Sequence, residues 1–171
     1  MILDMTIPVS ACGPSFHIQH VCTDAPSFKP AQRADIVRLE KAILDLNGGH
    51  DGADQCHLTH HFAPKVYGRE ILLPAGSDVV GKIHRHAHLN VIVKGRALVA
   101  TEFGSHEVKA GDIFVSEPGA KRAVHAIEDT VWMTIHPNEA DTQDLEQIEE
   151  YVIAPSYDAL SFEDTKKVGV A

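Results

Sequence analysis

The sequence lacks a cysteine framework. Its three cysteines, Cys12, Cys22 and Cys56, form an odd set without a CxxC pair, which argues against a disulfide-stapled scaffold and against a zinc ribbon. Reduced thiols are typical of cytoplasmic proteins, so we expect this compartment. Nucleophilic catalysis by Cys56 is discounted, because the adjacent His57 would point to the opposite face of an extended strand.

The chain also lacks long apolar runs and an excess of positive charge. No stretch approaches the ~20 apolar residues that cross a bilayer, and no basic and apolar leader pattern opens the sequence, so neither a membrane span nor a signal peptide is expected. The formal net charge of -9 argues against nucleic acid or an anionic membrane as a partner. The length of 171 residues, 44% of them hydrophobic, suits one structural domain that buries a core without disulfides.

Composition and hydrophobic pattern divide the sequence into three regions. Residues 1–55 are expected to form an extended arm and then one amphipathic helix, which starts near Pro30 and stops at Gly48. Residues 56–137 carry short apolar runs between turn signals, and residues 138–171 form a short acidic helix and a tail. The apolar stripe of the first helix follows a spacing of three and four, at Ile36, Leu39, Ile43 and Leu46.

The middle region has an all-β pattern. Short runs rich in valine, isoleucine and leucine alternate with glycine and proline turns, which is typical of a sandwich or a barrel. The predicted strands are 57–62, 67–73, 79–84, 88–94, 96–102, 105–109, 112–116, 121–127 and 130–136.

The most unusual pattern in the chain is the run from His84 to His88, with histidines at alternate positions. It leads directly into an apolar strand that ends at Gly95. Alternate residues of an extended segment point to one side, so these side chains would share a face. Neutral imidazole is a common metal ligand and proton shuttle, so the run predicts a site without saying which chemistry it performs.

Together with these histidines, two glycine-bounded segments resemble the motifs of the cupin superfamily. Pro74-Ala75-Gly76 opens the first segment and Gly95 closes it, while the run from Gly111 to Gly119 resembles the start of the second motif. The similarity covers roughly residues 67–136 and extends to small cupin-like proteins of bacteria and phages. It implies an all-β, cupin-type double-stranded β-helix (jelly-roll barrel) with an N-terminal helix and a short C-terminal acidic helix.

Aligned on Gly95, the cupin motifs place His84 and His88 at two usual ligand positions. The other two positions carry Lys82 and Arg122, which are basic, so a complete cupin metal site is not carried over. On residues 130–136, alternation places Trp132 and His136 on one face. The predicted metal ligands are therefore His84, His88 and His136, and an all-histidine set suits Zn, Fe, Ni or Cu.

For six other residues, five histidines and one glutamate, the sequence leaves a role in the site open. By strand parity, His125 lies opposite Arg122 and points away from the cavity unless a bulge intervenes. His86 and Glu70 are the candidate proton carriers, with His86 on a loop at the barrel mouth. The preceding strand contributes three further histidines that could reach the mouth: His57, His60 and His61.

An alternative to the metal site is a pocket for a small anionic molecule. Arginine offers a planar fork that matches carboxylate or phosphate. The predicted ligand-binding residues are Arg122, Lys82, Arg69, Asn90, Tyr67 and Trp132. Arg122 would need an anionic partner if buried, either Glu70, Glu102 or a bound acid.

These observations leave three classes of function open, because a fold alone does not choose among them. The first is a metal-dependent enzyme, such as a dioxygenase, isomerase or lyase that acts on a small polar or anionic molecule. The second is a small-molecule-binding module without metal, and the third is a structural or interaction protein, for instance one encoded by a phage. A homodimer is expected, since the N-terminal helix offers more apolar surface than one small barrel needs.

Overall fold

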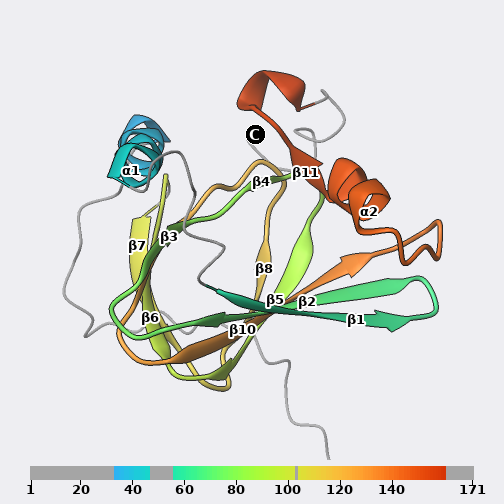
Figure 1. Ribbon diagram of the computed structural model, residues 1–171, viewed down its shortest axis with the longest axis horizontal. Coiled ribbons are helices and arrows are strands. Elements are labelled where there is room, and N and C mark those ends of the chain that lie inside the picture. The colour runs from blue at the N-terminus through green and yellow to red at the C-terminus, as the bar shows by residue number, and fades with distance from the viewer. Residues whose placement is uncertain (1–32, 47–55, 103, 161–171) are drawn as a thin grey trace, which may run out of the picture.

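The computed structural model describes residues 33–46, 56–102 and 104–160. Expectations for the N-terminal arm and for the tail beyond residue 160 lie outside these residues. Two antiparallel sheets form most of the described chain and face each other as the walls of a barrel (Figure 1). The predicted all-β class is therefore confirmed.

The first wall is a five-stranded sheet. Its strands follow the order β1-β2-β10-β5-β8, so β10, the last of these strands in the sequence, lies between β2 and β5. The strands are β1 (His57–Ala63), β2 (Val66–Leu73), β10 (Thr130–Pro137), β5 (His88–Lys94) and β8 (Ile113–Ser116).

The second wall is a four-stranded sheet in the order β3-β9-β6-β7. Strands β2-β10-β5-β8 opposite β3-β9-β6-β7 give the eight-stranded arrangement of a jelly roll, to which β1 adds an edge strand. The strands are β3 (Asp78–Val80), β9 (Ala123–Ala126), β6 (Arg96–Thr101) and β7 (Gly104–Lys109).

A small third sheet pairs β4 (Ile83–His84) with β11 (Ile153–Ala154). The predicted strand 79–84 is divided into β3 and β4. The division falls at Gly81, whose amide bonds the carbonyl of Arg122 at 2.8 Å while the next two residues turn toward β11. This turn brings His84 to one end of the barrel, beside the C-terminal segment.

The core lies between the two walls, where alternate residues of each strand point inward. On β10 and β5 these inward positions include Trp132 and Ile92, which face each other in register and are 5% and 0% exposed. The buried core cluster is Cys56, Leu73, Ile92, Ala97, Val99, Val108, Val124, Ala126 and Trp132.

The two helices differ in how firmly they dock. Helix α1 (Arg33–Leu46) contacts β3 and β6 and buries Ile36, but Leu46 at its end is 86% exposed, so the predicted stripe is only partly covered. Helix α2 (Leu145–Val152) starts at Asp144, whose carboxylate accepts bonds from two backbone amides of the first turn. It buries Ile148 and Val152. None of the helices in the described part of the chain is long and apolar enough to span a membrane.

Candidate metal centre

Three histidines from three strands meet inside the barrel. His84 ends β4, His88 begins β5 and His136 lies near the end of β10. His88 and His136 share the inward face of their strands with Ile92 and Trp132. The ring centroids are 4.1 Å apart for His84–His88, 4.5 Å for His88–His136 and 5.1 Å for His84–His136. One nitrogen from each ring lies within 4.8 Å of the other two.

The ring nitrogens of this cluster are buried without hydrogen-bond partners. They are Nδ1 of His84, Nε2 of His88 and Nδ1 of His136. The other nitrogen of His88, Nδ1, lies 3.2 Å from the carbonyl oxygen of His86. A carbonyl only accepts, so Nδ1 of neutral His88 carries the proton and Nε2 keeps a lone pair. Buried polar atoms seldom remain unpaired, so these three nitrogens fit the role of ligands to a bound ion.

All three imidazoles are held in the neutral form. Burial lowers the pKa of His88 to about 4. Burial and the neighbouring His88 lower the pKa of His136 to about 3. The pKa of His84 is also well below its ordinary value, because of burial first and then the adjacent histidines. Neutral imidazole is the form that ligates a metal, so no proton has to be displaced near pH 7.

A polar network lies next to the cluster and contains Arg122. Its Nη2 donates to Oγ of Ser116, and its Nη1 lies 3.5 Å from Oδ1 of Asn90. The same Oδ1 accepts a 3.0 Å bond from Nε1 of Trp132, while Nδ2 of Asn90 donates to Ser116 at 2.5 Å. Burial lowers the pKa of Arg122 to about 10. Asn90, which is predicted to contact a ligand, bonds Arg122, and Trp132 in turn bonds Asn90.

Arg69 and Tyr67 also lie on the inward face of the five-stranded sheet. In the register of β2 and β10, Arg69 pairs with Thr134 and Tyr67 with His136. The Tyr67 ring stacks on His136 with centroids 6.1 Å apart. Its hydroxyl lies 2.8 Å from Nδ1 of His60, so His60 joins the edge of the cluster through Tyr67.

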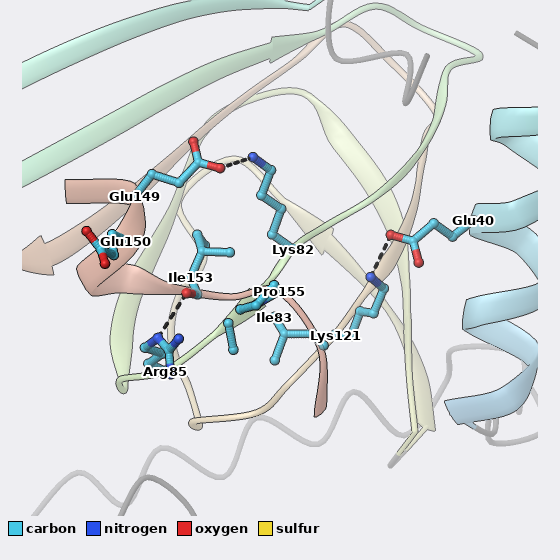
Figure 2. A pocket seen from close by; sticks show the side chains of 10 residues that line it. Glu40, Lys82, Ile83, Arg85, Lys121, Glu149, Glu150, Ile153 and Pro155 are labelled. Carbon is cyan, nitrogen blue, oxygen red and sulfur yellow. Dashed lines mark hydrogen bonds and ion pairs between the residues drawn. The ribbon is translucent and has the colours of Figure 1, made fainter. Parts of the chain in front are cut away.

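Two predicted residues lie elsewhere. Lys82 is half-exposed and forms an ion pair with Glu149 of α2, as Figure 2 shows, so it does not face the histidines. The carboxylate of Glu70 lies 3.2 Å from Nε2 of His61 and not near Arg122. Both side chains leave the barrel because they occupy outward positions, which strand alternation dictates for Glu70 beside inward Arg69.

The remaining histidines are placed as follows. His125 is exposed, with Nδ1 2.9 Å from Asp78, so it points away from the cluster. His86 is half-buried at the mouth and packs on Tyr151 of α2 with ring centroids 4.6 Å apart. Glu102, considered as a partner for Arg122, pairs with Arg33 of α1 instead.

The C-terminal segment crosses the mouth of the barrel beside His84. Arg85 binds this segment, since its guanidinium donates to the carbonyl of Ile153 at 2.9 Å (Figure 2). It also donates to the carbonyl of Ala159 at 2.8 Å. Sequence reasoning missed Arg85 and Ser116. The alternation of Phe114 and Ser116 before a Pro-Gly turn was a usable signal for Ser116, whereas nothing local indicated that Arg85 would bind a segment about seventy residues later.

Comparisons with known proteins show similarity at the level of structure. No protein-family model matches the chain, and no curated protein matches it. Solved structures do: KdgF from Halomonas sp. has 17% identity and a TM-score of 0.43, over 49% of this chain and 81% of that one. A cupin superfamily protein from Desulfitobacterium hafniense has 12% identity and a TM-score of 0.44, over 50% and 80%.

A third similar structure is a salicylate 1,2-dioxygenase from Pseudaminobacter salicylatoxidans. Its identity is 13% and its TM-score 0.47, over 67% of this chain and 34% of the dioxygenase. At these identities the similarity concerns the fold, so the function proposed below is derived from this chain's own residues.

Proposed function

We propose that this cupin-like chain binds one divalent transition-metal ion through His84, His88 and His136. The observation that carries the proposal is that His84, His88 and His136 each bring one ring nitrogen within 4.8 Å of the other two. Each ring also has a buried nitrogen without a hydrogen-bond partner. The residues fit such an ion, since neutral imidazoles are its usual ligands and the His86 carbonyl already orients His88.

The ligand chemistry limits the choice of metal and of site. The cluster contains only imidazoles, which suit Zn, Fe, Ni or Cu and disfavour Mg and Ca. Three protein ligands are typical of catalytic sites that keep a position for water or substrate, whereas structural sites are usually closed by four. This number supports a reactive centre over a purely structural one.

A metal-dependent dioxygenase, isomerase or lyase acting on a small polar molecule is the activity that we propose for this centre. When bound, the ion would supply Lewis acidity or lower the pKa of a coordinated water. The chain supplies the rest: Arg122, held by Asn90 and Ser116, offers a cation beside the cluster. Half-buried His86 at the mouth is the candidate that carries a proton between the site and solvent.

Metal uptake tests the proposal directly. The protein, stripped with a chelator and titrated with Zn²⁺, is expected to bind one equivalent per chain. His84→Ala with His88→Ala should abolish binding by elemental analysis, because only one strong ligand remains. His88→Gln alone, which keeps side-chain volume, should weaken Zn²⁺ affinity by at least about 10-fold, as expected for a lost ligand.

The matched control is His125→Ala, because this histidine is exposed and pairs with Asp78 outside the cluster. It should bind Zn²⁺ like the unchanged protein. Absence of stoichiometric uptake in the folded wild type, or an equal loss in the His125 variant, would contradict the metal site and favour a metal-free binding or interaction protein.

We also propose that the chain forms a homodimer through the outer face of the five-stranded sheet. Outward positions of β5 and β8 are apolar and exposed: Leu89 (43%), Val93 (53%), Ile113 (61%) and Val115 (56%). Light scattering should give twice the 18.6 kDa of one chain, and Ile113→Lys with Val115→Lys should give a monomer. A monomeric wild type would refute the dimer, and Leu46→Lys on α1 serves as the surface control.

A further inference from the structure

The interior of the barrel carries two arginines without a described carboxylate to balance them. Arg122 bonds only neutral groups, Ser116 and Asn90. Arg69 lies on the inward face of β2, and its guanidinium has no hydrogen-bond or ion-pair partner among the described residues. The two acids considered as partners are engaged elsewhere, Glu70 with His61 and Glu102 with Arg33. Both arginines are only partly buried, and a charge in such a position is favoured by an anionic partner, so this arrangement fits an anionic ligand.

A row of inward-facing residues that includes Arg69 is only partly buried. Arg69, Thr134 and Phe114 lie in one row across the five-stranded sheet, and all three keep partial exposure although they face inward. Asn90 completes the row and is fully buried. In the adjacent row toward the mouth, Tyr67, His136, His88 and Ser116 are all buried. The partly exposed row therefore lies directly beside the buried row that contains two of the three histidines.

Both arginines lie close to that cluster. Ser116, which accepts a hydrogen bond from Arg122, pairs with His88 across β8 and β5. Arg69 pairs with Thr134, which lies two residues before His136 on the same face of β10. A molecule that reached the histidine nitrogens from this row would lie within the field of both guanidinium groups.

We propose that Arg69 and Arg122 form the anchoring site for a small oxyanion, a carboxylate or phosphate group, on the molecule that the histidine centre binds. The inference rests on the proposed function for the position of the histidines, but the arginine site does not require the metal in order to bind. Guanidinium forks match these planar or tetrahedral oxyanions in geometry and charge. Asn90 and Ser116 act as positioning residues, because they fix the guanidinium of Arg122 before the anion arrives.

The test uses malonate and inorganic phosphate as probes, each titrated into metal-free and Zn²⁺-treated protein and followed by calorimetry and by the unfolding midpoint. At least one probe is expected to bind the wild type and raise its midpoint. Arg122→Met and Arg69→Met should each weaken that binding at least tenfold. Arg96→Met is the control, since this arginine is exposed on β6 and pairs with Glu107 and Glu128.

A second measurement keeps the proposal falsifiable if neither probe has the right shape. In Arg122→Met, Asn90 and Ser116 each keep another hydrogen-bond partner, so removal of an uncompensated charge should raise the midpoint of the ligand-free protein. Failure of both probes together with an unchanged or lowered midpoint in Arg122→Met would overturn the anion site and make Arg122 structural. Probe binding that neither arginine variant weakens would overturn it as well. Loss of Zn²⁺ uptake with intact probe binding would overturn the metal centre alone.

Discussion

The metal-free protein is expected to lose stability steeply as the pH falls from about 7 to 5. His88 and His136 have folded-state pKa values of about 4 and about 3, whereas the ordinary value is 6.5. Below pH 6.5 the unfolded chain takes up protons that the folded chain does not bind. The stability contributed by these neutral histidines is therefore complete above pH 6.5 and is lost as the pH falls toward the folded values.

The expected loss in the free energy of unfolding is large for a domain of this size. Each of the two histidines should destabilise the folded state by about 2 kcal/mol at pH 5, because one pH unit below the unfolded pKa corresponds to about 1.36 kcal/mol. His84 adds to the effect in the same direction. Since ordinary carboxylates titrate near pH 4, the window from 7 to 5 isolates the histidines. Urea unfolding at intervals across this window measures the loss.

The control for this prediction is the variant with His88→Gln and His136→Gln, which has no titrating group at either position. Whatever its absolute stability, its free energy of unfolding should vary less with pH than that of the wild type, by about 4 kcal/mol over the window. Parallel curves for the two proteins would show that the histidines are not held neutral, and would remove the electrostatic basis for the metal centre.

Gly95→Ala is expected to destabilise the barrel by about 3–5 kcal/mol, which combines the strain of a left-handed residue with overpacking. Gly95 joins β5 to β6 with φ of +80°, and a Cβ atom there would lie 2.3 Å from the carbonyl oxygen of Asp129 and 2.7 Å from Oγ1 of Thr130. The nearest atom is the backbone carbonyl oxygen of Asp129, so a rotamer change does not relieve the clash. Thermal unfolding should show a much lower midpoint.

Gly76→Ala provides the matched control, since Gly76 has the same φ of +80° but nothing within 4 Å of the added Cβ. This variant should be destabilised by only about 1–2 kcal/mol, which is the conformational cost of alanine at a positive φ. The difference between the two variants measures the close approach of the β5–β6 turn to the start of β10. Equal effects would mean that this contact is not tight in solution.

Much of the barrel could be predicted from the sequence because strand signals are local. Runs such as 88–94 and 130–136 carry β-branched residues between turn residues, and the observed β5 and β10 agree with them within a residue. The predicted strand 79–84 was wrong as a single element, because its end pairs with β11 far along the chain. Pairing with a strand so distant in the sequence cannot be predicted from the local pattern.

Some features of the candidate site could likewise be predicted from the local pattern, whereas others depend on tertiary contacts. Alternation by itself determined that Trp132 and His136 would share a face and that His125 would point away. The prediction that His84, His86 and His88 share a face was wrong for His86, because the chain bends between β4 and β5 and His86 packs on Tyr151. Only the tertiary structure decided that His136 meets the other two, that Arg122 lies among neutral partners, and that Lys82 turns outward to Glu149. The physical reason is that alternation orients a side chain relative to its own strand, whereas its neighbours depend on sheet order and on the segments that close the barrel.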